Sequence, residues 1–135
     1  MAVPQETLIR VRFAETDAMR FVYYANHFVY YEVARTEWLA ANGLPYHQLE
    51  EEGCGIPVLQ AHCDYRKPAR YGDELWIRSV PSDVDGLRLR FDYETRRGGP
   101  EGLLLAVGWT VHVCMDRAGR PRRPPEKLME LLEAV

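Results

Sequence analysis

Residues 26–43 read NHFVYYEVARTEWLAANG, and they contain the best helix candidate of the chain, His27–Asn42. Asn26 is expected to cap the helix start, because its side-chain oxygen can accept a free backbone N–H. Gly43 suits the left-handed position just past the last turn. Apolar residues cover a wide surface of this helix, which indicates that other structure wraps around it. These residues are Phe28, Val29, Tyr30, Tyr31, Val33, Ala34, Trp38, Leu39, Ala40 and Ala41.

Strand-like segments lie on both sides of this helix. The clearest alternation of apolar and polar residues runs over Leu87–Arg96, and the longest apolar stripe runs from Leu103 to Met115. Turn residues separate the later segments, and such short turns favour antiparallel neighbours. The predicted strands are Thr7–Phe13, Leu59–Arg66, Leu75–Val80, Leu87–Arg96 and Leu103–Met115.

The order of these segments predicts an α+β domain over residues 1–135. One antiparallel sheet wrapped around one long central helix satisfies the pattern, and a short amphipathic helix is expected over Pro125–Val135. Turn lengths leave the order of the strands in the sheet open. A single sheet around one helix also leaves exposed edges, so self-association is expected.

Composition excludes several classes of protein. The chain has 17 Lys and Arg against 20 Asp and Glu, a formal net charge of −3, which argues against a dedicated nucleic-acid partner. No apolar run is long enough to span a bilayer, and the first residues do not resemble a signal peptide. Cys54, Cys63 and Cys114 match no zinc spacing, and they indicate reduced thiols in a cytoplasmic protein.

The irregular segment from Ala14 to Ala25 is the candidate functional region, since structured connections of this length are often functional. It contains Asp17, and two interpretations of this residue stay open. A loop aspartate before a helix is commonly a turn or cap residue. It can equally be a catalytic carboxylate held near the amino end of a helix. Both interpretations predict an aspartate at this position, so spacing alone does not decide.

Several blocks of the sequence resemble the 4-hydroxybenzoyl-CoA thioesterase family, and most of all its Tol–Pal-associated acyl-CoA thioesterases. The first blocks are the most specific, and together the matches cover nearly the whole chain. They are Val11–Met19 (VRFAETDAM), Val22–His27 (VYYANH), Tyr31–Thr36 (YEVART), Asp64–Asp73 (DYRKPARYGD), Met115–Asp116 and Gly119–Pro125 (GRPRRPP).

This resemblance implies a hotdog fold and hydrolysis of an acyl-CoA thioester without a cofactor. No metal is expected, because His62 and Cys63 are strand neighbours that point to opposite faces, and His112 and Cys114 lack visible partners. The carboxylate of Asp17 would attack the thioester directly or activate a water. The backbone N–H of Tyr24, at the start of the long helix, would stabilise the oxyanion. Tyr23, Asn26 and His27 would bind the substrate.

Arg20 stands where the family commonly has glycine. Because glycine allows a tight backbone turn, this departure puts the shape of the Asp17 loop in question. A distorted loop could bind acyl-CoA without hydrolysing it, so a non-catalytic acyl-CoA-binding module is one alternative function. A hotdog hydratase or dehydratase acting on acyl thioesters is another, and it would need a histidine base beside a carboxylate.

Coenzyme A carries phosphates, so its site needs cations near the mouth of the pocket. The candidates are Lys67, Arg70, Arg88 and Arg90, for which solvated surface charges are the alternative interpretation. Glu32 and Arg35 are three residues apart on the predicted helix, which is typical of an ion pair. The alternative is that Glu32 faces the substrate from the helix, as a carboxylate does in some other hotdog thioesterases. The resemblance further implies a homodimer or homotetramer with active sites between subunits.

Overall fold

The computed structural model describes residues 2–133, so the end of the predicted helix at Val135 lies outside the described residues. Five strands form one antiparallel sheet in the order β1-β3-β4-β5-β2, and the two-residue strand β6 pairs with β5. The strands are β1 (Gln5–Arg10), β2 (Val58–Tyr65), β3 (Glu74–Asp83), β4 (Arg88–Arg97), β5 (Leu104–Met115) and β6 (Pro121–Arg122).

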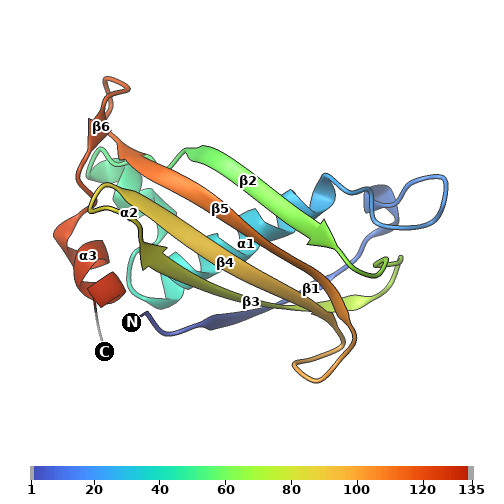
Figure 1. The fold of residues 1–135 in the computed structure, drawn as a ribbon. Helices are drawn as coiled ribbons and strands as arrows, with labels where there is room; N and C mark the ends of the chain where they lie inside the picture. The colour runs from blue at the N-terminus through green and yellow to red at the C-terminus, as the bar shows by residue number, and fades with distance from the viewer. Residues whose placement is uncertain (1, 134–135) are drawn as a thin grey trace.

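The long helix α1 (Asn26–Ala41) runs along one face of this sheet (Figure 1), which agrees with the predicted α+β architecture. The helix is not wrapped on all sides as its apolar residues predict, because Val29 is 52% and Val33 is 36% exposed. A hydrogen bond from Ser79 on β3 to the carbonyl of Ala34, 3.4 Å long, ties the helix to the sheet. Trp38 is fully buried and its indole N–H donates to the Val3 carbonyl at 2.7 Å. The core therefore lies between α1 and the sheet.

The start of α1 differs from the prediction, because Asn26 is its first residue and does not cap it. The capping position belongs to Ala25, which makes no side-chain hydrogen bond. Asn26 Nδ2 instead donates to the Glu15 carbonyl at 2.9 Å. The prediction assumed that this side chain accepts a bond from its own helix, whereas it binds the preceding loop.

The end of α1 agrees with the prediction. Gly43 has a φ of 79°, in the left-handed region where glycine is favoured, and the Leu44 N–H donates back to the Leu39 carbonyl at 2.8 Å.

Alternate residues of each strand form the inner face of the sheet, which packs against α1. On β4 the buried set is Leu89, Phe91, Tyr93 and Thr95, as the alternation predicts. On β5 the apolar stripe from Val107 to Val113 lies on the outer face, whereas Leu105, beside a shift in the register with β4, is buried in the core. Tyr93 pairs with Gly108, and cross-strand partners share a face, so Gly108 points toward α1. The inner positions of β5 are therefore Gly108, Thr110, His112 and Cys114.

Several local predictions need correction. Phe13 is not in a strand: β1 ends at Arg10, and Phe13–Glu15 form a short 3-10 helix in which Phe13 is 75% exposed. The short helix α2 (Tyr46–Glu51) was not predicted, because six residues carry little periodicity. The C-terminal helix α3 covers Glu126–Glu133, and its Leu128 and Leu132 are buried, as expected from their spacing.

Among the described residues, no helix combines the length and apolar character that crossing a membrane requires.

Candidate active site

The loop around Asp17 is a tight hairpin closed by its own backbone. The N–H of Asp17 donates to the Phe21 carbonyl at 2.8 Å, and the N–H of Arg20 donates to the Asp17 carbonyl at 2.9 Å. Val22 joins the hairpin to the segment after β2 by donating to the Ala69 carbonyl at 2.8 Å. The hairpin is therefore fixed at both its tip and its base.

Arg20 closes this hairpin in a left-handed conformation, with a φ of 65°. This is the backbone shape that glycine adopts readily, and most other residues adopt it at a cost. The arginine has therefore kept the tight turn, and the departure from the family pattern has not opened the loop.

The Asp17 carboxylate belongs partly to this hairpin. Its Oδ1 accepts hydrogen bonds from the N–H groups of Met19, at 2.9 Å, and Phe21, at 3.3 Å. In the described part of the chain its second oxygen, Oδ2, accepts none. One oxygen therefore has the predicted turn role, and because the other is free, the catalytic interpretation stays a prediction.

Asp17 and the amino end of α1 line a common hollow of about 320 Å³. Within residues 2–133 the backbone N–H of Tyr24, one residue before the capping position Ala25, has no acceptor. The positive end of the helix dipole lies at the same place. The remaining residues around the hollow are Phe21, Val22, His27, Tyr65, Arg66, Lys67, Pro68 and Ala69.

The peptide of Tyr24 is held in position by two neighbouring contacts. Tyr65 on β2 donates its hydroxyl to the Tyr24 carbonyl at 3.0 Å. The N–H of His27 donates to the same carbonyl at 3.2 Å. The carbonyl is thus satisfied on one side of α1, while the N–H of Tyr24 is left available.

His27 is buried beside this hollow and is uncharged at neutral pH. Burial lowers the pKa of its imidazole to about 4. Its ring meets Tyr30 and Tyr65 edge-on, with centroids 5.9 and 5.2 Å away. Its Nδ1 is buried with no hydrogen-bond partner in the part of the chain that the structure describes.

Glu15 connects the loop with the helix. Its carboxylate accepts bonds from the Arg12 N–H at 2.9 Å, from the Arg12 guanidinium at 3.0 Å and from the Tyr30 hydroxyl at 2.8 Å. Burial raises the pKa of Glu15, but these three bonds outweigh it and lower the pKa below its ordinary value. The Glu15 carboxylate therefore holds the 3-10 helix against α1.

The structure brings together only some of the residues predicted for the site. Asp17, Tyr24, His27 and Lys67 line the hollow. Arg70 lies beside it, with its guanidinium 4.9 Å from the centre of the Phe21 ring. Tyr23 is exposed and packs on Tyr24, and Asn26 binds Glu15, so neither lines the hollow.

Arg88 and Arg90 do not reach the hollow beside Asp17 of the same chain. Arg88 pairs with Asp85 at 2.9 Å, and Arg90 pairs with Asp92 at 3.0 Å and covers the Trp109 ring. Through Val111, Arg90 is aligned with Gln60, five residues before Tyr65 on β2. At about 3.3 Å per residue, this places Arg90 some 16 Å along the sheet from the hollow.

Three residues were missed by the sequence analysis: Glu15, Tyr65 and Arg66. All three lie in the blocks that carry the family resemblance, and that was the only signal available for them. Their roles depend on contacts across the fold, such as the one between Tyr65 and Tyr24, which are 41 residues apart.

Among residues 2–133, no group of three or more His, Cys, Asp and Glu side chains is arranged to hold a metal ion.

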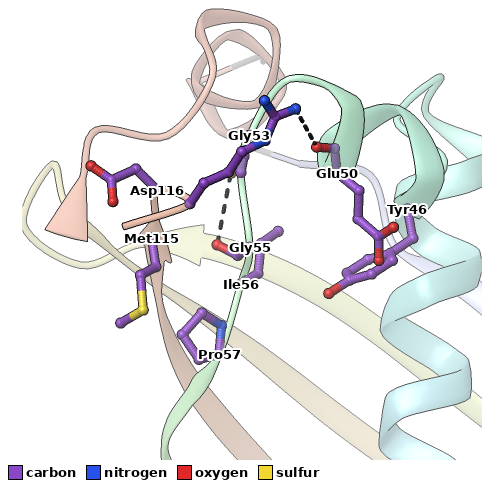
Figure 2. Close-up of a pocket in the computed structure, with 10 residues that line it drawn as sticks. Tyr46, Glu50, Gly53, Gly55, Ile56, Pro57, Met115 and Asp116 are labelled. Atoms are coloured by element: carbon purple, nitrogen blue, oxygen red, sulfur yellow. Dashed lines mark hydrogen bonds between the residues drawn. The ribbon is translucent and has the colours of Figure 1, made fainter. Parts of the chain in front are cut away.

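A second hollow, of about 420 Å³, lies between α2 and the end of β5 (Figure 2). There Gly55 and Met115 exchange two backbone hydrogen bonds of 2.9 Å, and Arg117 donates to the Glu50 carbonyl at 3.3 Å.

A carboxylate beside the amino end of a long helix on one face of an antiparallel sheet is the arrangement that the resemblance to hotdog thioesterases implies. Residues 11–132 match the thioesterase-like superfamily, and the chain belongs to that family.

Relatives support the same class of enzyme, a thioester hydrolase. The 1,4-dihydroxy-2-naphthoyl-CoA hydrolase of Thermosynechococcus vestitus is 31% identical over 127 residues, which cover 93% of this chain and 86% of the relative. The acyl-CoA thioester hydrolase YbgC of Escherichia coli is 31% identical over 122 residues, or 90% of each chain. The solved structure of the hypothetical protein TT1821 from Thermus thermophilus superimposes with a TM-score of 0.88 and 37% identity, covering 97% and 96% of the two chains.

Proposed function

We propose that this protein hydrolyses acyl-CoA thioesters in the hollow shared by Asp17 and the amino end of α1. The observation that carries the proposal is that the free Asp17 oxygen and the unbonded N–H of Tyr24 belong to residues that line the same hollow. A carboxylate and an oxyanion donor are the two groups that thioester hydrolysis needs.

In the nucleophilic route, Asp17 Oδ2 attacks the thioester carbonyl carbon, and the carbonyl oxygen becomes an oxyanion. The N–H of Tyr24 donates to that oxyanion, which typically stabilises the transition state by about 3 kcal/mol. The C–S bond then breaks, the CoA thiolate takes a proton from water, and a second water hydrolyses the mixed anhydride to the acid and a regenerated Asp17.

In the general-base route, Asp17 Oδ2 takes a proton from a water whose oxygen attacks the same carbon. The oxyanion and the donor are unchanged, and the CoA thiolate leaves in the second step. A single turnover in ¹⁸O-water that gives unlabelled product acid and labelled Asp17 would establish the nucleophilic route, because only that route can place an Asp17 oxygen in the product acid.

The cations around the hollow suit the phosphates of coenzyme A. Arg66 and Lys67 line it and Arg70 flanks it, so three positive charges follow one another along the segment after β2. Charge-assisted bonds from such side chains are the usual means of binding phosphate.

Of the two alternative functions, the non-catalytic acyl-CoA-binding module is no longer supported by the observation that suggested it. It depended on a distorted Asp17 loop, and Arg20 instead keeps the loop tight. A hydratase is tested separately by measuring water addition to an enoyl-CoA. The 4-hydroxybenzoyl-CoA branch, a cytoplasmic location and a homodimer or homotetramer stay predictions, the last supported by the largely exposed edge strand β2.

The decisive test compares thiol release from short, long, branched and aromatic acyl-CoAs by the wild type and by Asp17→Asn. We expect Asp17→Asn to lower kcat by at least about 100-fold on the preferred substrate. Glu101→Gln, which changes an exposed carboxylate to an amide in the turn before β5, is the matched control and should leave kcat unchanged. Equal rates for Asp17→Asn and the wild type would remove Asp17 from the mechanism.

A further inference from the structure

A third hollow, of about 380 Å³, lies under the middle of α1 and is separate from the one beside Asp17. Its floor is apolar, since Phe91 on β4 is fully buried and Leu39 on α1 is 3% exposed. Thr36 and Tyr46 stand at its exposed rim. Its volume and its apolar lining are typical of sites for small organic molecules.

Arg35 enters this hollow from α1 and is partly buried there. The ion pair expected between Arg35 and Glu32 is not formed: among residues 2–133, no carboxylate lies within 4.0 Å of the Arg35 guanidinium. Glu32 lines the same hollow but is exposed. A guanidinium against apolar walls without a counter-ion is costly, and an anion in the hollow would offset that cost.

The polar groups beneath the hollow supply no negative charge. Tyr93 and Thr110 hydroxyls lie 2.6 Å apart, Thr110 is 2.8 Å from His112 Nε2, and His112 Nδ1 is 3.3 Å from the Ile56 carbonyl. Because a carbonyl only accepts, Nδ1 carries the hydrogen, Nε2 accepts from Thr110, and Thr110 accepts from Tyr93. The Tyr93 oxygen is left as an acceptor at the open end of this chain of hydrogen bonds.

The titratable members of the chain are neutral. Burial lowers the pKa of His112 to about 4, and the positive charge of Arg35 acts in the same direction. Burial raises the pKa of the Tyr93 phenol, and the nearby Arg35 guanidinium only partly offsets this. Beneath the hollow Arg35 therefore faces only neutral groups, while the exposed Glu32 carboxylate stands at the mouth. At most one or two of the five N–H donors of Arg35 are needed by the Tyr93 oxygen.

Two stacked rings separate this hollow from the one beside Asp17. Tyr31 lies one helical turn after His27 and one turn before Arg35, and its ring stacks on Tyr93 with centroids 4.0 Å apart and planes 3° apart. The two hollows share no lining residue. A molecule could therefore occupy one while the other holds substrate.

We propose that the hollow under α1 is a binding site for a small organic acid. The apolar body of the acid would pack on Phe91 and Leu39, and its carboxylate would pair with Arg35. The proposal does not depend on the thioesterase proposal, since none of these residues takes part in that chemistry.

The test measures the affinity of octanoate by isothermal titration calorimetry, with coenzyme A present to occupy the hollow beside Asp17. We expect Arg35→Met to weaken octanoate binding at least about tenfold, and Arg35→Lys to weaken it less, because the positive charge stays. Octanamide, which has the same body without the charge, should bind wild-type protein about as weakly as octanoate binds Arg35→Met. Arg78→Met removes an exposed arginine of β3 and should bind octanoate like the wild type.

A second variant keeps the test independent of folding defects at Arg35. Thr36 is exposed at the rim, so Thr36→Trp should cover the hollow, leave the core intact and abolish octanoate binding. Glu32→Gln should tighten binding, since it removes a negative charge from the mouth. Octanoate binding that neither Arg35→Met nor Thr36→Trp weakens, or that coenzyme A or Asp17→Asn abolishes instead, would overturn the proposal.

Discussion

Arg20 shows how one residue can depart from a family pattern and keep its backbone. Its φ of 65° costs a non-glycine residue roughly 1 kcal/mol. The hydrogen bonds of the hairpin, including the two that Asp17 Oδ1 accepts, hold it in this conformation. Arg20 is therefore expected to lower the stability of the protein without changing the shape of the Asp17 loop.

Replacing Arg20 with glycine should relieve this strain. We expect Arg20→Gly to raise the free energy of unfolding by about 0.5–1 kcal/mol, partly offset by the greater freedom of glycine in the unfolded chain. Arg20→Ala removes the same side chain but keeps the strain, and it is the matched control. Urea titration of the three proteins measures the difference, and an Arg20→Gly variant no more stable than Arg20→Ala would contradict the explanation.

Lys67 should act on binding and not on chemistry. It lines the hollow as an exposed cation, so Lys67→Met is expected to raise KM for an acyl-CoA about 3- to 10-fold with kcat nearly unchanged. The same acyl group on N-acetylcysteamine, which has no phosphates, should show no change in KM. An equal rise in KM with both substrates would mean that Lys67 does not bind phosphate.

At the scale of elements, the site depends on how closely α1 approaches β5. Gly108 faces the helix, and a Cβ at this position would lie 2.5 Å from the His62 carbonyl oxygen and 2.6 Å from the Tyr31 hydroxyl. Tyr31 in turn contacts Cys63 Sγ on β2 at 3.2 Å. Because Gly108 has no side chain, Tyr31 can pack closely against β5, and this contact sets the position of α1 on the sheet.

Gly108→Ala should therefore lower the free energy of unfolding by about 1–3 kcal/mol, because backbone atoms of β2 cannot yield as a flexible side chain can. Gly99→Ala is the control, since a Cβ at Gly99 meets no atom within 4 Å. Thermal and urea unfolding measure both variants. If Gly108→Ala is as stable as Gly99→Ala, the close approach of α1 to β5 is not required.

At the scale of the whole molecule, two buried histidines link stability to pH. Burial lowers the pKa of His27 and of His112 to about 4, whereas an unfolded chain has its histidines near 6.5. Between these values the unfolded state binds more protons, so the stability falls as the pH drops from 6.5 toward 4. Above pH 6.5 these two groups give no pH dependence.

Each of these histidines should contribute up to about 1.4 kcal/mol per pH unit within that window. We expect His27→Gln to reduce the slope of unfolding free energy against pH between 6.5 and 4.5. His47→Gln changes an exposed histidine on α2 and should keep the wild-type slope. Urea titrations at four or five pH values give the slopes, and identical slopes for all three proteins would contradict the role of burial.

The sequence by itself determined the elements that depend on local periodicity. The spacing of apolar residues placed α1 within one residue at each end, and the alternation along β4 identified its buried face. The motifs around Asp17 and Tyr24 then indicated the class of enzyme, because the resemblance lies in short, contiguous blocks.

Only the tertiary structure decided which residues meet. The inner face of β5 followed from its register with β4, and the removal of Arg88 and Arg90 from the site followed from their distance along the sheet. Tyr65 gained Tyr24, 41 residues away, as a partner for the same physical reason. Periodicity describes contacts within one turn or one strand, whereas these contacts join residues far apart in the chain, and packing alone brings such residues together.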